Sequence, residues 1–179
     1  MTVSSPARMG YLWLSGVIVA LDQATKTIVD RTLALHESRS VIDGLVRLTY
    51  VQNRGAAFGI FSDAELPYQH LLLALVSLGA LAAIAVYAWR LPARARLPQT
   101  ALALVMGGAV GNLLDRARLG YVIDYVDVFW GAYHWPAFNV TDAAISVGVT
   151  LLVLDILKNP QGDAEPEPEV AASAPGRTE

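Results

Sequence analysis

The 179-residue sequence contains no cysteine, and only 16% of its residues are charged. The missing cysteine excludes disulfides, thiolate nucleophiles and Cys-ligated zinc sites. The low charge, together with 54% hydrophobic residues and a mean hydropathy of +0.42, is typical of a membrane protein rather than of a soluble domain of this size. The formal net charge of −3 provides no basic field for nucleic acid, so no nucleic-acid partner is expected.

Histidine is also scarce. His36, His70 and His134 are far apart in the sequence, and the HExxH pattern of an intramembrane zinc peptidase is absent. We therefore expect neither a metal site nor any other cofactor. The sequence has no internal repeat or inverted symmetry, a feature that many secondary transporters do have.

Long apolar stretches dominate what is present. Leu71–Trp89 and Leu97–Leu114 contain no charge, and each has close to the roughly 20 residues needed to cross the hydrocarbon core. Two further stretches, Met9–Val29 and Trp135–Leu154, include a few polar residues. The first resembles a signal peptide, but three more apolar stretches follow it and leave no soluble domain to export. The sequence therefore predicts a mainly α integral membrane protein with four transmembrane helices.

The connections between these spans differ in character. Leu45–Asn53 alternates and is rich in β-branched and aromatic residues, which predicts a strand. Open sheet edges cannot lie in lipid, so we expect a small extracytoplasmic β-sheet at the membrane surface. Arg116–His134 is expected to form a polar loop. Residues 1–158 should form the transmembrane domain, and the Pro- and acid-rich residues 159–179 a disordered cytoplasmic tail.

Three arginines in the short connection Arg90–Arg96 place this loop in the cytoplasm by the positive-inside rule. With four spans, both termini are then cytoplasmic, and the two longer connections face outward. The raw count of basic residues is less clear, because the first connection also contains four arginines: Arg31, Arg39, Arg47 and Arg54. The density of charge favours the first orientation.

Aspartates lie where lipid should exclude them. Asp22, Asp115 and Asp142 fall inside or at the edge of apolar stretches, and Asp124 lies in the polar loop before the fourth span. An ionised side chain at membrane depth costs at least about 2.5–3.5 kcal/mol and normally faces a protein interior or a wet cavity. The predicted topology gathers these acids at one outer rim, together with further polar residues: Lys26, Asn53, Gly55, Asn112, Arg116 and Asn139.

Five motifs in this order carry a family resemblance: DQATK (22–26), NRGAAFG (53–59), GNLLDR (111–116), VIDYVDVF (122–129) and PAFNVTDAAI (136–145). Together the motifs resemble those of the lipoprotein signal peptidases, also called signal peptidase II, from about Met9 to Lys158. The resemblance implies a four-span aspartyl endopeptidase of the bacterial inner membrane, which cleaves lipidated prolipoproteins just before the diacylglyceryl-cysteine. It implies a catalytic pair, Asp124 and Asp142, and substrate-binding residues, namely Asn53, Gly55, Asn112, Arg116 and Asn139.

Physical chemistry supports such a pair independently. Hydrolysis of an amide without metal or nucleophile needs a base to activate water and an acid to protonate the leaving nitrogen. Two adjacent carboxylates provide both, because like charges resist double ionisation and one group keeps its proton. We therefore predict that Asp124 and Asp142 share one proton and hold one water molecule.

Structural roles remain open for several of these residues. Asn139 and Asp142 have the spacing of an N-cap and its N3 partner, and Asp22 and Lys26 that of an intrahelical ion pair. Asp115 is expected at a helix C-terminus, where a donor such as Arg116 must compensate its charge. The remaining open positions are Asn53 and Asn112, which could satisfy local backbone; Gly107 and Gly111, expected in close helix packing; and Phe58 and Phe61, which could form an apolar flap. Two residues depart from the family pattern. Thr141 adds a hydroxyl beside the expected pair, and Asp127 adds a carboxylate three residues after Asp124, so that either Asp124 or Asp127 could point inward.

Two other functions compete with a peptidase. A small transporter or proton relay would also place carboxylates within the membrane, although here the acids cluster at one rim instead of crossing the bilayer. A non-catalytic scaffold would tolerate replacement of Asp124 or Asp142. The expected partners of the preferred peptidase are lipidated prolipoproteins and membrane lipid, and the chain is expected to be a monomer.

Overall fold

The computed structural model describes residues 6–55, 68–92 and 94–158. Four helices in these ranges are long and apolar enough to cross a membrane. They are α1 (Pro6–Thr32), α2 (Gln69–Arg90), α3 (Arg96–Leu119) and α4 (Val140–Lys158). The shortest span has 19 residues, or about 28 Å at 1.5 Å per residue, close to the thickness of the hydrocarbon core. Four transmembrane helices with a small sheet were predicted, and this fold class is confirmed.

Helix α3 lies at the centre of the bundle and packs against the other three helices. Its glycines allow backbones to approach. A Cβ on Gly107 would lie 2.9 Å from the Ser15 carbonyl oxygen of α1, and one on Gly108 would lie 2.6 Å from the Thr141 carbonyl oxygen of α4. Both distances are too short for carbon against oxygen. The predicted close packing through small residues of the third span is therefore confirmed.

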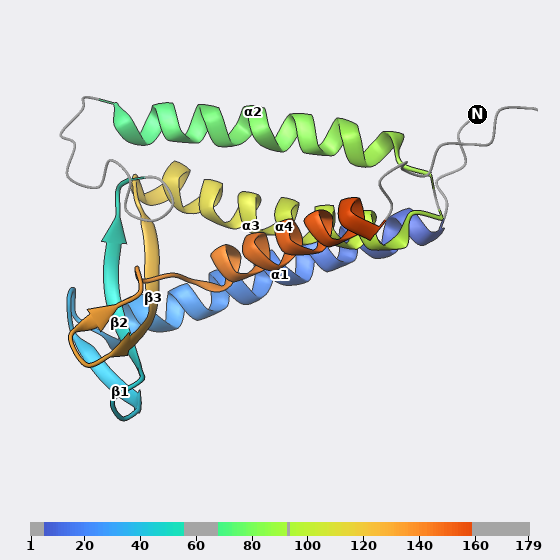
Figure 1. Ribbon diagram of the computed structural model, residues 1–179. Coiled ribbons are helices and arrows are strands. Elements are labelled where there is room, and N and C mark those ends of the chain that lie inside the picture. The colour runs from blue at the N-terminus through green and yellow to red at the C-terminus, as the bar shows by residue number, and fades with distance from the viewer. Residues whose placement is uncertain (1–5, 56–67, 93, 159–179) are drawn as a thin grey trace, which may run out of the picture.

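A four-stranded antiparallel sheet with the order β1-β2-β3-β4 lies across one end of the bundle (Figure 1). The strands are β1 (Ser38–Ile42), β2 (Val46–Asn53), β3 (Val122–Trp130) and β4 (Tyr133–His134). Strand β2 confirms the strand predicted for Leu45–Asn53. Strand β3 corrects the prediction that Arg116–His134 forms a polar loop. Val122–Trp130 alternates with β-branched and aromatic residues, and pairing with β2 places Asp124 opposite Val51.

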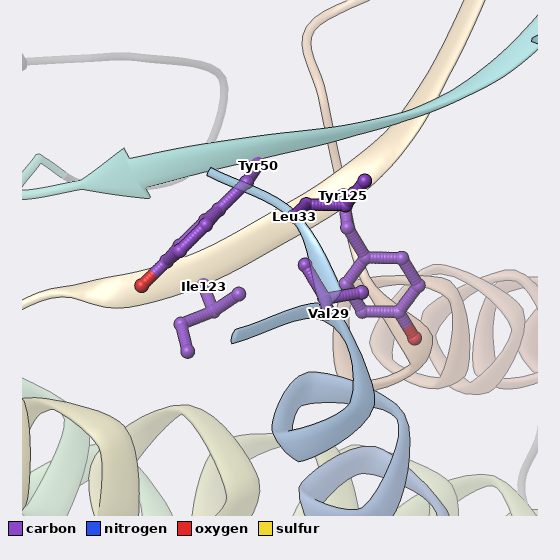
Figure 2. Packing of buried hydrophobic residues seen from close by; sticks show 5 residues of the cluster. All are labelled: Val29, Leu33, Tyr50, Ile123 and Tyr125. Carbon is purple, nitrogen blue, oxygen red and sulfur yellow. The ribbon is translucent and has the colours of Figure 1, made fainter. Parts of the chain in front are cut away.

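A small hydrophobic core joins the sheet to the end of α1 (Figure 2). Val29 and Leu33 from α1 and its end pack against Tyr50 of β2 and against Ile123 and Tyr125 of β3. All five side chains are buried. This contact fixes the position of β3 relative to the helices, and with it the position of Asp124.

Two predicted helix boundaries are wrong. Helix α4 begins at Val140, not at Trp135, because the segment before it pairs with β3 through Val126 and Phe138. Helix α3 does not end at Leu114 but continues to Leu119, where Gly120 adopts a left-handed conformation with φ of 80°. Its N–H bonds the Arg116 carbonyl oxygen, which ends the helix as a C-cap.

The described chain begins and ends at the same end of the bundle, opposite the sheet (Figure 1). The short connection between α2 and α3 lies at that end as well, so both longer connections emerge at the sheet end, as predicted. Phe58, Phe61 and the tail 159–179 lie outside the described residues.

Candidate active site

Asp124 is buried in the middle of β3, with 3% of its surface exposed. Each carboxylate oxygen accepts one hydrogen bond from a side-chain amide. Asn53 Nδ2 donates to Oδ2 at 2.9 Å, and Asn139 Nδ2 donates to Oδ1 at 2.8 Å. The strand therefore places Asp124 at the sheet end of the helices, where the sequence had suggested only a loop.

Asp142 lies in the first turn of α4 and also receives a bond on each oxygen. The Asn139 backbone N–H donates to Oδ2 at 3.2 Å, and Asn112 Nδ2 donates to Oδ1 at 2.9 Å. The Asp142 N–H in turn donates to Asn139 Oδ1 at 3.0 Å. This reciprocal pair is a capping box, so the expected capping role is confirmed. A carboxylate at a helix N-terminus also gains from the helix dipole.

Asn139 joins the two aspartates because it donates to both, to Asp142 through its backbone N–H and to Asp124 through its side-chain amide. It is itself only 1% exposed. The two carboxylates are therefore close enough for one residue to bond both of them. The donors on their oxygens are all neutral amides, which orient the carboxylates without adding positive charge to the pair.

The position of Asp124 changes its acidity. Burial, and then the nearby charge of Asp142, raise the pKa of Asp124 to about 7, although the hydrogen bonds from Asn53 and Asn139 and the charge of Lys26 oppose the rise. At neutral pH, Asp124 thus holds a proton for a large fraction of the time. This is the behaviour expected of two adjacent carboxyl groups in a poorly solvated place.

Lys26 connects α1 to α3 near the site. Its ammonium group lies 2.9 Å from Asp22 Oδ2 and 2.8 Å from Asp115 Oδ2, and it donates to Asn112 Oδ1 at 3.1 Å. These contacts match the three hydrogens of an ammonium group. The predicted ion pair with Asp22 is therefore confirmed, but Lys26 also bonds across to α3, which spacing within one helix could not reveal.

Asp115 does not lie at a helix C-terminus, because α3 continues for another turn. The donor that compensates its charge at contact distance is Lys26, and the guanidinium of Arg116 adds an electrostatic interaction. Gln23 Nε2 donates to its Oδ1 at 2.8 Å, and the Ile123 N–H of β3 donates to its Oδ2 at 3.3 Å. Asp115 thus links α1, α3 and β3, which is a structural role.

Arg116 bonds the protein's own backbone. Its Nη2 donates to the Gly55 carbonyl oxygen at 3.0 Å, and the Gly55 N–H donates to Asn53 Oδ1 at 2.9 Å. Its guanidinium also interacts electrostatically with Asp142 and Asp124. Asn53, Gly55 and Arg116 therefore form a continuous chain of contacts that ends at Asp124.

Asp127 belongs to a different cluster. Arg47 Nε donates to its Oδ2 at 2.6 Å, and His134 Nδ1 lies 3.0 Å from its Oδ1. Burial acts to raise the pKa of Asp127, but the bonds with His134 and Arg47 outweigh it, and the pKa is lowered. Three residues along a strand correspond to about 10 Å. Asp127 therefore contacts Arg47 of β2 and His134 of β4, and none of the residues that donate to Asp124 or Asp142.

Gln23 was missed as a site residue from the sequence. It bridges the α1–α3 ion cluster, and its place inside the DQATK stretch was the available signal. Thr141 was expected to add a hydroxyl beside the pair, but its contacts with two asparagines were not foreseen. Its hydroxyl lies 2.5 Å from Asn139 Oδ1 and 2.8 Å from Asn112 Oδ1, between the amides that bond the two aspartates.

Comparisons with known proteins show the family of the chain. The family model for signal peptidase (SPase) II matches residues 14–158. A lipoprotein signal peptidase of Geobacter sulfurreducens is 52% identical over 140 residues, which cover 78% of this chain and 86% of that protein. One from Haemophilus influenzae is 38% identical over 157 residues, covering 88% and 91%.

The fold also matches solved structures. One described as a bacterial membrane enzyme superposes with a TM-score of 0.75 at 28% sequence identity, covering 89% of this chain and 94% of that one. A second with the same description gives a TM-score of 0.72 at 30% identity, covering 84% and 94%. The matched residues 14–158 include both aspartates and every residue that bonds them. This chain therefore belongs to the signal peptidase II family.

Proposed function

We propose that this protein is an aspartyl endopeptidase that removes the signal peptide from lipid-modified prolipoproteins, cleaving just before the diacylglyceryl-cysteine, with Asp124 and Asp142 as catalytic residues. Membership of the signal peptidase II family supports the peptidase function and the multi-pass location in the bacterial inner membrane. The observation that carries the catalytic assignment is that Asn139 bonds both carboxylates while the pKa of Asp124 is raised to about 7.

In the proposed mechanism, Asp124 holds the single proton of the pair and Asp142 is ionised. The Asp142 carboxylate takes a proton from a water molecule whose oxygen bonds to the scissile carbonyl carbon. At the same time Asp124 gives its proton to the carbonyl oxygen, which produces a neutral gem-diol.

Collapse of the gem-diol reverses the roles of the two acids. Asp142 donates its new proton to the leaving nitrogen as the carbon–nitrogen bond breaks, and Asp124 takes a proton from one gem-diol hydroxyl. The products are an amine and a carboxylic acid, and the pair again holds one proton on Asp124. One water molecule is consumed in each turnover, and the pair is regenerated unchanged.

Asn53, Gly55 and Arg116 are proposed to present the substrate backbone to the pair. Their contacts form a continuous polar chain that ends at Asp124. The Arg116 guanidinium has donors beyond the one bound to Gly55, and these suit a substrate carbonyl oxygen. Asn112 and Asn139 are proposed to act on the aspartates and, through them, on the bound substrate.

We further propose that the catalytic unit comprises residues 1–158 and acts as a monomer, with both termini in the cytoplasm and the pair at the outer interface. The three arginines of the Arg90–Arg96 connection support this orientation. The signal helix of the substrate and its acyl chains would then bind from the membrane, where lipid is the second partner. The acidic residues 159–179 are proposed to lie outside the peptidase domain.

The direct test uses purified protein in detergent with a diacylglyceryl-modified precursor and a metal chelator. Asp124→Asn and Asp142→Asn each remove one carboxylate while keeping its size. Both should reduce cleavage at least about 100-fold, because acid–base catalysis by the pair is lost. Asn at 142 keeps an acceptor for the helix cap, so folding should be retained.

Asp127→Asn is the matched control, since it removes a carboxylate from the same strand that bonds only Arg47 and His134 among the described contacts. It should retain cleavage. Full activity in either Asp124→Asn or Asp142→Asn would refute the catalytic assignment. A transporter or proton relay would instead lose transport without accumulating uncleaved precursor, but family membership gives no support to that alternative.

A further inference from the structure

Thr141 lies in the first turn of α4, directly before the aspartate Asp142. Its side chain is fully buried, at 0% exposure. The Oγ1 hydroxyl lies 2.5 Å from Asn139 Oδ1 and 2.8 Å from Asn112 Oδ1. It is therefore in contact with both of the amides that bond Asp124 and Asp142.

An amide side chain has an oxygen at one side and an NH2 group at the other, so a donor on the oxygen determines where the NH2 points. The Asp142 N–H donates to Asn139 Oδ1, and this turns Asn139 Nδ2 toward Asp124. Lys26 donates to Asn112 Oδ1, which turns Asn112 Nδ2 toward Asp142. In both residues, the oxygen that sets the orientation also contacts Thr141.

The Thr141 hydroxyl has one hydrogen, so it donates to one amide oxygen at a time. Each donation reinforces the orientation that the other donor already imposes. A fully buried site with no solvent to compete makes such a bond effective at restricting rotation of the amide. Thr141 Oγ1 thus contacts both asparagines through one atom, and Asn139 Nδ2 adds a longer contact of 3.4 Å with Asn112 Oδ1.

We propose that Thr141 is a positioning residue for the peptidase reaction: its hydroxyl holds the Asn139 and Asn112 amides in the orientation that directs their NH2 groups onto the two aspartates. The proposal rests on the proposed catalytic role of Asp124 and Asp142. Thr141 itself touches neither substrate nor the reacting atoms, and it acts through the two asparagines.

The structure separates the hydroxyl of Thr141 from its methyl group. The γ-methyl lies against Gly111 of α3, so close that a Cβ on Gly111 would overlap it. The methyl thus belongs to helix packing, and the hydroxyl to the amides. Thr141→Val keeps the packing and removes the hydroxyl, whereas Thr141→Ser keeps the hydroxyl and removes the methyl.

The test compares both variants with the unaltered protein in steady-state cleavage of a diacylglyceryl-modified precursor in detergent. Thr141→Val should lower kcat about three- to tenfold with little change in KM, the effect of losing one hydrogen bond that aligns the reacting groups. Thr141→Ser should retain kcat near the unaltered value. Thermal unfolding measured alongside distinguishes loss of alignment from loss of fold.

Thr150→Val is the matched control, because it is the same change on the same helix and its exposed hydroxyl bonds the Ser146 carbonyl oxygen one turn earlier. It should leave kcat unchanged. Wild-type kcat in Thr141→Val would overturn the proposal, as would a fall in Thr141→Ser equal to that in Thr141→Val. If Asp124→Asn and Asp142→Asn abolish cleavage while Thr141→Val keeps the kcat of the unaltered protein, this inference fails and the proposed function stands.

Discussion

Neutral amides surround the two aspartates of the site, and this choice of residue has a chemical consequence. A lysine or arginine bonded directly to either carboxylate would favour the fully ionised pair and remove the proton that we propose the pair shares. Asn53, Asn112 and Asn139 orient the carboxylates while adding no charge. The nearest ammonium, that of Lys26, bonds the oxygen of Asn112 and reaches Asp142 only through that amide.

The raised pKa of Asp124 predicts a pH dependence of cleavage. Asp124 is protonated below its pKa of about 7 and loses its proton above it. Because the proposed mechanism needs one proton on the pair, kcat/KM of the free enzyme should fall as pH rises through about 7. The apparent value belongs to the coupled pair, and a pH profile of kcat/KM measures it.

Asn53→Ala should move this descending limb of the pH profile of kcat/KM to higher pH. The Asn53 bond lowers the pKa of Asp124, so its removal raises that pKa, by about one unit for a bond to a charged group. Asp127→Asn serves as the control and should leave the limb in place. A limb that stays fixed in Asn53→Ala, or moves equally in Asp127→Asn, would contradict the assignment of the proton to Asp124.

Among the elements, α3 determines how closely the other helices approach the site. Gly111 faces α1 and α4 together: a Cβ there would overlap the Thr141 γ-methyl and lie 2.8 Å from Asp22 Oδ2. The small residue thus permits two buried polar groups from different helices to meet at one turn of α3. The same turn carries Asn112, so packing and chemistry depend on the same stretch of backbone.

Gly111→Ala should therefore destabilise the protein. The added methyl forces α1 or α4 away, at a cost of about 1–3 kcal/mol for overpacking, and it disturbs Thr141 and Asp22. Thermal unfolding in detergent should show a lower midpoint, with reduced cleavage.

Gly79→Ala on α2 is the matched control for that change. A Cβ at Gly79 meets nothing within 4 Å, and alanine is the better helix former. Its unfolding midpoint should stay the same or rise. Equal midpoints for the two variants would argue that α3 does not pack as described.

In the whole molecule, the sheet and the aspartates lie at one end and both described chain ends lie at the other (Figure 1). Four spans place the two described chain ends on the same side, since an even number of crossings returns the chain to its starting side. In the proposed topology, the arginines of the connection after α2 set the direction of the molecule in the membrane.

The absence of native cysteine makes the orientation directly measurable. Ser40→Cys places an exposed thiol on β1, and Pro92→Cys places one in the exposed connection between α2 and α3. A membrane-impermeant maleimide should label Ser40→Cys in cells with a permeable outer envelope. It should label Pro92→Cys only after the inner membrane is opened. The reverse pattern would invert the proposed topology.

The sequence determined the class of the molecule and most of its elements. Four apolar stretches of membrane-spanning length and the alternation in Val46–Asn53 are local features of the sequence. Such patterns form helices in lipid and half-buried strands, whichever segments they later pack against. The capping box of Asn139 and Asp142 and the ion pair of Asp22 and Lys26 are equally local, because their spacing along one helix is enough to bring the partners together.

Only the tertiary structure decided the contacts between segments distant in the chain. Strand β3 shows its alternation in the sequence, but pairing with β2 across about 70 residues makes it a strand instead of a polar loop. The same closure brings Asn53 to Asp124, Lys26 to Asp115 and Thr141 to Asn112. These bonds depend on how three helices and a sheet pack together in space. The spacing of residues within one segment does not show which distant segment will lie next to it.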